Sequence, residues 1–271
     1  MEWKNIYRGI MMGASDVIPG VSGGTIAVLL GIYDRLIASI NGFLSKDWKK
    51  QLGFLIPLGI GIVTAIFSLS HLIDWLFEHY PKPLQFFFLG LILGILPYLF
   101  HQADAKKTFK VKHFFLLMIG TGMVGSMVFL SAGEGIVIQE KTLSTYVLLL
   151  SSGFIASSAM ILPGISGSLI LMIIGVYQMI INGIKTLQLD IVAVVGIGIV
   201  LGIVVMSKII HFFLANYRAA TFALVIGLVI GSVFVVFPGW PAEVSIVVMS
   251  VVAFALGLAA AYTLGKLEYE A

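Results

Sequence analysis

The chain has 271 residues, of which 59% are hydrophobic and 11% are charged, and its mean hydropathy is +1.08. So few charges cannot cover a soluble domain of this size, and several windows approach the roughly 20 apolar residues that cross a bilayer as a helix. The net charge is only +3, no basic patch with interleaved aromatic residues indicates nucleic-acid binding, and the absence of cysteine excludes thiolate metal ligands. The composition predicts an all-α, polytopic membrane protein, for which we expect no cofactor and no metal.

The first predicted element is a helix that begins near Lys4, because the amino terminus lacks the regions of a cleaved secretory signal. Pro19 removes a backbone donor and Gly20 tolerates unusual backbone angles, so the helix should stop there. Residues 22–25, Ser-Gly-Gly-Thr, then indicate a turn that begins a second helix, with serine or threonine as its N-cap. Non-helical backbone at membrane depth must be buried in protein or line a wet cavity, so this turn should face the protein interior.

Three long apolar stretches follow the turn, and the whole series then recurs. Pro19 reappears 144 residues later as Pro163, and Gly59 reappears 137 residues later as Gly196. Chance similarity between glycine-rich helices is the alternative, but a shared register over so long a span indicates duplication. The predicted transmembrane stretches are residues 53–77, 84–100 and 113–131 in the first half, and 191–210, 219–237 and 243–264 in the second.

Each half is predicted to hold a broken or re-entrant Pro-Gly helical hairpin plus three transmembrane helices. The first repeat covers residues 1–135 and the second covers 140–271, within one transmembrane domain. Because three crossings is an odd number, a hairpin that enters and leaves on one side leaves the second half inverted. Inverted repeats of this kind are typical of transporters, with the substrate site near the midplane. The arm 25–43 is long for a half-membrane excursion, so hairpins that cross fully remain an alternative.

The distribution of basic residues predicts the orientation, since lysine and arginine concentrate in cytoplasmic loops. If both termini are cytoplasmic, the outside loops hold only Lys82, Lys141 and Lys185. The opposite orientation would put the long basic runs outside. With both termini in the cytoplasm, the basic residues on the inside are Lys4, Arg8, Lys46, Lys49, Lys50, Lys106, Lys107, Lys110, Lys112, Lys208, Arg218 and Lys266.

The two Pro-Gly turns predict a site for an anion. The first N–H groups of a helix have no partner within it, the helix dipole adds partial positive charge, and small residues let a ligand reach the backbone. We expect one such terminus from each half to face the other near the midplane and to bind a phosphate or a carboxylate. The alternative is that Pro-Gly only kinks a packed helix whose glycines serve close helix contact. Pro19 and Pro163 are structural turn residues, and the candidate phosphate-binding residues are Ser15, Asp16, Gly20, Ser22, Gly23, Gly24, Thr25 and Arg35 in the first half, and Ser158, Gly164, Ser166, Gly167 and Ser168 in the second.

Asp16 is the single acid of the first turn, and the second copy has Met160 in its place. Its carboxylate would repel a phosphate unless it is protonated, and desolvation favours the protonated form, so Asp16 is the candidate for proton coupling. The alternative is that it caps a local backbone N–H. Arg35 lies about 24 Å from Pro19 along a straight helix, which favours an interfacial anchor over a phosphate ligand, unless an inward-open state brings Arg35 to the phosphate.

The segment SDVIPGVSGGT, followed by IAVLLGIYDRLI, together with LPGISGS in the second half, resembles the bacterial polyprenyl-phosphate transporters, a family long described only as a membrane domain of unknown function. The resemblance covers essentially the whole chain. It implies a multi-pass protein of the bacterial cytoplasmic membrane that returns undecaprenyl phosphate, the lipid carrier of cell-wall synthesis, from the outer to the inner leaflet. The implied partners are this lipid and the membrane lipids, with no nucleic acid, and homo-oligomerisation stays open.

Three other functions are weighed against a lipid flippase. A membrane phosphatase would need a nucleophile or general acid with cationic partners, but Arg35 and Arg218 are the only arginines beyond the first ten residues. A secondary transporter of a small anion would suit the same helix termini and is the main alternative. A scaffold without transport activity would gain nothing from buried polar turns. We therefore expect a transporter and not an enzyme.

Overall fold

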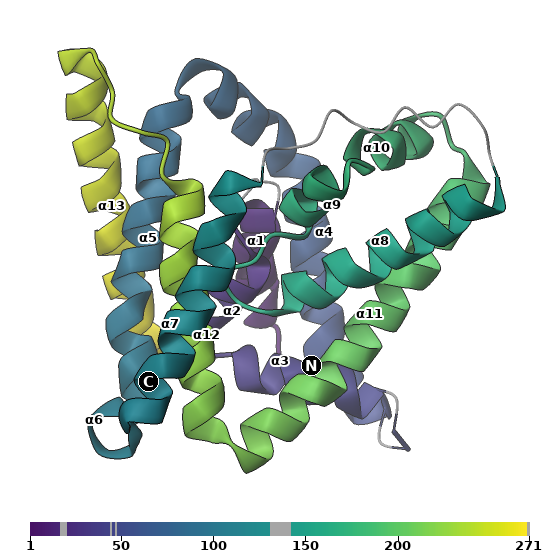
Figure 1. Ribbon diagram of the computed structural model, residues 1–271, viewed down its shortest axis with the longest axis horizontal. Helices are drawn as coiled ribbons and strands as arrows, with labels where there is room; N and C mark the ends of the chain where they lie inside the picture. Colours follow the sequence, from purple (N-terminus) through teal and green to yellow (C-terminus); the bar gives the residue numbers. More distant parts are fainter. Residues whose placement is uncertain (17–20, 44, 47, 131–141, 270–271) are drawn as a thin grey trace.

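The computed structural model describes residues 1–16, 21–43, 45–46, 48–130 and 142–269, and within these ranges every regular element is a helix (Figure 1). In chain order the elements are α1 (Asn5–Asp16), α2 (Gly23–Leu29), α3 (Tyr33–Phe43), α4 (Trp48–His79), α5 (Pro81–Gln102), α6 (Ala105–Thr108), α7 (Val111–Gly125), the 3-10 helix η1 (Ser126–Phe129), α8 (Leu143–Ile161), α9 (Gly167–Ile174), α10 (Tyr177–Lys185), α11 (Leu189–Asn216), α12 (Arg218–Val236) and α13 (Val244–Tyr269).

Seven segments in the described ranges are long and apolar enough to cross a membrane: most of α4, α5, α7 with η1, α8, α11, α12 and α13. The pair α9 and α10, bent by 109°, would make an eighth span if the pair crosses as one. The predicted all-α, multi-span membrane protein is therefore confirmed. Six of the spans overlap the six apolar stretches expected from the sequence. The seventh, α8, is not among the stretches expected from the sequence, and its 19 residues meet the length of a span.

Two short helices end at glycines with left-handed backbone. α2 and α3 are separated by Gly31, which has a φ of +65°, and α9 and α10 by Gly175, with a φ of +90°. Glycine adopts this conformation without a steric penalty and so ends each helix. The straight helix assumed between Pro19 and Arg35 is therefore interrupted, because the chain turns between α2 and α3.

The helices pack most extensively in four pairs: α1 with α4, α8 with α11, α5 with α13, and α7 with α12. Each pair crosses where a glycine of one helix faces a glycine of the other. A Cβ atom added to any of these glycines would lie 2.0–2.6 Å from a backbone carbonyl oxygen of the partner helix, so the small residues allow the backbones to touch. The facing glycines are Gly9 and Gly61, Gly153 and Gly198, Gly90 and Gly257, and Gly120 and Gly227.

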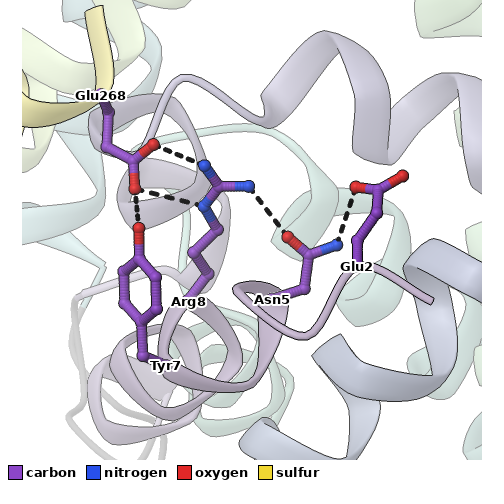
Figure 2. A network of polar contacts seen from close by, with 5 residues as sticks. All are labelled: Glu2, Asn5, Tyr7, Arg8 and Glu268. Atoms are coloured by element: carbon purple, nitrogen blue, oxygen red, sulfur yellow. Dashed lines mark hydrogen bonds and ion pairs between the residues drawn. The ribbon is translucent and has the colours of Figure 1, made fainter. Parts of the chain in front are cut away.

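Both chain ends lie at one end of the bundle, together with α6 and the turn between α11 and α12, whereas the turn between α4 and α5 lies at the other end (Figure 1). A polar network joins α1 to the end of α13 (Figure 2). Arg8 binds both carboxylate oxygens of Glu268, to which Tyr7 also donates. Arg8 Nη1 donates to Asn5 Oδ1 at 2.9 Å, and Asn5 Nδ2 donates to Glu2 at 3.2 Å. The first and last helices are thus fastened to each other.

Candidate functional site

The first turn leads into a helix that is wholly enclosed by protein. Every residue of α2 is buried. Ser22 is its N-cap, with extended backbone and a hydroxyl that accepts from the Gly24 N–H at 3.1 Å, so the predicted serine cap is confirmed. The expected turn residues Pro19 and Gly20 lie outside the described residues.

Asp16, the last residue of α1, occupies the start of α2. Its Oδ1 accepts a hydrogen bond from the Gly23 N–H at 2.6 Å. A Cβ atom at Gly23 would lie 2.7 Å from the other carboxylate oxygen, so glycine is what lets the carboxylate approach. An anionic group at a helix N-terminus is stabilised by the free N–H groups and by the helix dipole. The capping role considered for Asp16 thus matches the geometry, and the carboxylate sits where an external anion would bind.

The second turn differs at the corresponding place. Ser166 precedes α9, but its hydroxyl bonds to Ser168 Oγ at 2.8 Å instead of capping the backbone. Met160 stands where the first half has Asp16, and its side chain lies 3.4 Å from a Cβ atom built on Gly167. Within the described part of the chain, the N–H groups of Gly167 and Ser168 have no hydrogen-bond partner. The start of α9 therefore has two backbone donors that are unpaired among the described residues, whereas the Gly23 donor at the start of α2 is taken by Asp16.

The two turns contact each other directly. Thr25 Oγ1 accepts a hydrogen bond from the Gly164 N–H at 2.8 Å. Ser22 Oγ donates to the Met160 carbonyl at 3.1 Å, and the Tyr33 hydroxyl donates to the Ile161 carbonyl at 3.2 Å. We call this contact of Ser22, Thr25 and Tyr33 with residues 160–164 the hairpin crossing. Ser22, Thr25 and Tyr33 are only 1–3% exposed, so the crossing lies inside the protein.

Gly164 is fixed by its surroundings. It has a φ of +90°, and a Cβ atom there would lie 2.5 Å from the carbonyl oxygen of Leu228 in α12. Both its backbone conformation and the close approach of α12 require glycine. The neighbouring Pro163 lies in the turn between the end of α8 and the start of α9, where the sequence also placed a turn.

Two other predicted site residues use their hydroxyl groups elsewhere. Ser15 Oγ donates to the Met12 carbonyl at 2.7 Å, within its own helix. Ser158 Oγ donates at 3.4 Å to the carbonyl of Gly202 in α11. Both side chains are buried, and only the Ser158 bond joins two helices, α8 and α11.

Arg35 lies away from the hairpin crossing, with 49% of its side chain exposed. Its Nη2 is 3.8 Å from Glu2 Oε1, and its guanidinium lies 5.6 Å from the ring centre of Phe54. The adjacent Asp34 pairs with Arg218 of α12 at 2.8 Å. These contacts suit the interfacial role that the sequence favoured for Arg35.

Sequence reasoning did not select Tyr33 or the space next to it. Tyr33 had a signal, because it recurs 144 residues later as Tyr177, but an aromatic repeat in a membrane helix is ordinarily packing. Beside it lies a cavity of about 440 Å³ whose wall is almost entirely apolar, formed mainly by α11 and α12. Among the described residues, no group of three or more histidine or carboxylate side chains could hold a metal ion.

Comparison with known proteins gives the family. Residues 12–255 match the VCA0040-like family, described as undecaprenyl phosphate translocase-like. The polyprenyl-phosphate transporter of Staphylococcus aureus (strain NCTC 8325 / PS 47) is 42% identical over 99% of this chain and 98% of its own. That of Vibrio cholerae serotype O1 (strain ATCC 39315 / El Tor Inaba N16961) is 40% identical over 88% of this chain and 79% of its own. No solved structure gives a significant match. The chain therefore belongs to the VCA0040-like family, and it is a multi-pass membrane protein of a transporter family, not an enzyme.

Proposed function

We propose that this protein carries polyprenyl phosphate, with undecaprenyl phosphate as its substrate, from the outer to the inner leaflet of the bacterial cytoplasmic membrane. The observation that carries the proposal is the bond between Thr25 and Gly164, which joins the two broken helical segments inside the protein. The Staphylococcus aureus relative named a polyprenyl-phosphate transporter aligns over 99% of the chain, which includes both turns, and the Vibrio cholerae relative aligns over 88%. A flippase has to shelter only the phosphate, while most of the tail stays in lipid.

In this proposal the phosphate binds at the hairpin crossing. The N–H groups of Gly167 and Ser168 and the hydroxyls of Ser166 and Ser168 supply donors at the start of α9. Backbone donors at a helix N-terminus suit phosphate particularly well. The start of α2 supplies a further donor, the Gly23 N–H, once the Asp16 carboxylate leaves it. Ser22 and Thr25 hold the two turns together, whereas Arg35 lies away from the crossing.

Asp16 and the phosphate compete for the same backbone donors. Protonation of Asp16 removes a negative charge beside the phosphate and weakens its hold on the Gly23 N–H, since hydrogen bonds to charged groups are stronger than those to neutral ones. Uptake of a proton by Asp16 would thus open the N-terminus of α2 to the substrate. The absence of an acid at Met160 makes the mechanism asymmetric between the two halves.

We further propose that the chain is an inverted repeat of residues 1–135 and 140–271, with the boundary outside the described residues. The facing glycines support it. Gly9 and Gly61 of the α1–α4 pair correspond, at offsets of 144 and 137, to Gly153 and Gly198 of the α8–α11 pair. The glycines of the α5–α13 and α7–α12 pairs also correspond to each other at an offset of 137. In these last two pairs each half contributes one helix, so the halves are interlocked.

The positions of basic residues support cytoplasmic termini. α6, with Lys106 and Lys107, lies at the end of the bundle that holds both chain ends (Figure 1). The opposite end, at the turn between α4 and α5, holds Lys82. Lysines concentrate on the cytoplasmic side of bacterial membrane proteins. Lys141, expected outside, is not among the described residues.

Reconstitution tests the proposed activity. Liposomes that contain the purified protein and labelled undecaprenyl phosphate in one leaflet should exchange the label faster than empty liposomes do. The same vesicles loaded with inorganic phosphate test the alternative of a small-anion transporter. Exchange no faster than in empty vesicles would remove the lipid flippase, and phosphate flux without lipid exchange would establish the alternative.

A further inference from the structure

The cavity beside the hairpin crossing has the size of a ligand site. Its volume is about 440 Å³, within the roughly 300–1,000 Å³ of typical small-molecule pockets. α11 contributes Met206, Ile210 and Phe213 to its wall, and α12 contributes Leu224 and Val225. A cavity lined by such side chains has no groups to hold water in place. Its occupant should therefore be hydrocarbon.

The few hydroxyl groups near this cavity point to the same conclusion. The Tyr33 hydroxyl donates to the Ile161 carbonyl, and Thr221 Oγ1 donates to the Tyr217 carbonyl within α12's first turn. Both donors are thus engaged by the protein. Tyr217 itself is more than half exposed and caps the start of α12. The inner wall therefore lacks a free donor for a polar ligand.

The cavity is continuous with the hairpin crossing. Tyr33 and Leu162 belong to its lining, and both are also part of the crossing, where Tyr33 binds the Ile161 carbonyl. At its other side the cavity reaches Ile209, which is 44% exposed on α11. A chain that enters at the crossing can leave past Ile209 toward the lipid that surrounds the helices.

We propose that this cavity binds the isoprene units next to the phosphate of the polyprenyl phosphate, so that α11 and α12 select the lipid by its tail. The inference rests on the proposed function, since the crossing must hold the phosphate. Ser22, Thr25 and Tyr33 of the crossing are only 1–3% exposed, so this enclosed place favours a compact monophosphate over the larger head group of a bilayer phospholipid. The occupant is therefore the tail of a lipid with a small head.

Photolabelling of the whole protein in liposomes tests the tail site separately from transport. The probe is a polyprenol that carries a diazirine near its hydroxyl end and has no phosphate. We expect its label on α11 and α12 around residues 206–225, with Ala220→Phe lowering labelling about tenfold, because the loss of two buried methylene groups already changes affinity by that factor. Ala220 lines the cavity, whereas its neighbour Ala219 does not. Ala219→Phe is therefore the matched control and should label as the wild type does.

A second variant covers the case in which Ala220→Phe does not fold. Ile209→Trp adds bulk at the mouth of the cavity, where the side chain is partly exposed and can be accommodated, and it should also lower labelling. Equal labelling of Ile209→Trp and the wild type would overturn the tail site. So would labelling of residues 206–225 by a diazirine phosphatidylcholine as strong as that by the polyprenol.

The outcomes separate the tail site from the phosphate site. Ser168→Ala removes a proposed phosphate donor, so it should slow exchange of undecaprenyl phosphate and leave polyprenol labelling unchanged, because the probe has no phosphate. If the wild type labels at residues 206–225 but exchanges no undecaprenyl phosphate, the proposed function fails and the isoprenoid site stands. If it exchanges the lipid but the label is spread evenly over the helices, the isoprenoid site fails and the function stands.

Discussion

Thr25 Oγ1 accepts a hydrogen bond from the Gly164 N–H at 2.8 Å, although 139 residues separate the two. The bond is buried and joins the first turn of α2 to the second Pro-Gly turn. Among the described residues the Gly164 N–H has no backbone partner, so the Thr25 hydroxyl is what satisfies it. The bond thus ties together the two segments that carry the proposed phosphate site.

Replacing Thr25 by valine should destabilise the protein. Valine keeps the shape but removes the acceptor, and a buried N–H without a partner costs about 1–3 kcal/mol. Thr25→Ser keeps a hydroxyl that can accept the bond, so it should lower the stability of the protein less than Thr25→Val does. The melting temperatures of the purified proteins in detergent measure the effect, and exchange of undecaprenyl phosphate should fall in parallel. If Thr25→Val has the same melting temperature as the wild type, the bond does not hold the turns together.

Replacing Gly164 by alanine should be more severe, because two costs add. Its φ of +90° is unfavourable for alanine, and the new Cβ atom would lie 2.5 Å from the Leu228 carbonyl oxygen. Gly239 is the control, since it has a φ of +75° but no atom within 4 Å of its Cβ position. Gly239→Ala should show the backbone strain alone, about 1–2 kcal/mol, and melt above Gly164→Ala. Equal melting temperatures would mean that α12 moves aside.

A pair of glycines on α11 tests the tight helix contact. A Cβ atom at Gly198 would lie 2.2 Å from the Leu150 carbonyl oxygen of α8, whereas Gly196 has no atom within 4 Å of its Cβ position. Gly198→Ala should therefore lower the melting temperature, and Gly196→Ala should leave it unchanged or raise it, because alanine is the better helix former by about 1 kcal/mol. The same contrast is expected in α4 for Gly61 and Gly59. Equal melting temperatures of the two alanine variants in either pair would contradict the close contact between the helices.

The ion pair between Arg8 and Glu268 should contribute to stability. The two side chains are 17% and 10% exposed, and a hydrogen bond to a charged group contributes about 1.5–3 kcal/mol. Arg8→Met should lower the melting temperature by a corresponding amount. Arg35→Met is the control, since its pair with Glu2 is 3.8 Å long and half exposed, which corresponds to less than about 1 kcal/mol. An equal effect of the two variants would show that the network in Figure 2 adds nothing.

The sequence was sufficient to predict the features that depend on local chemistry. The order Ser-Gly-Gly-Thr predicted the Ser22 cap, and the long uncharged runs predicted six of the spans. The bend at Gly31 was not predicted, because glycine is frequent in these helices and only the left-handed backbone marks the break.

The contacts between distant segments could not be predicted from the sequence. The bond from Gly164 to Thr25 depends on how α2 packs against the end of α8. Similarly, Arg35 of α3 was considered as a phosphate ligand because it follows the turn in sequence. In the structure it pairs instead with Glu2, in the segment before α1. The apolar cavity depends on how α11 and α12 are placed relative to each other. The pattern of apolar residues along each helix does not specify that placement.

Asp16→Asn tests the proposed coupling to protons. The amide oxygen of asparagine can still accept from the Gly23 N–H, but the side chain carries no charge at any pH, so the variant imitates protonated Asp16. In the wild type, exchange of undecaprenyl phosphate should slow as pH rises, because the ionised carboxylate holds the α2 N-terminus and repels the phosphate. The variant should lose this slowing and keep only the pH dependence that comes from the lipid phosphate. Ser15→Ala is the control, because the Ser15 hydroxyl donates to the Met12 carbonyl within α1. This variant keeps the Asp16 carboxylate, so its pH profile should match that of the wild type. Titration of the lipid phosphate itself affects the wild type and both variants alike, so the comparison isolates Asp16. If the rate and the pH profile of Asp16→Asn equal those of the wild type, Asp16 is a structural cap and proton coupling has no basis at this residue.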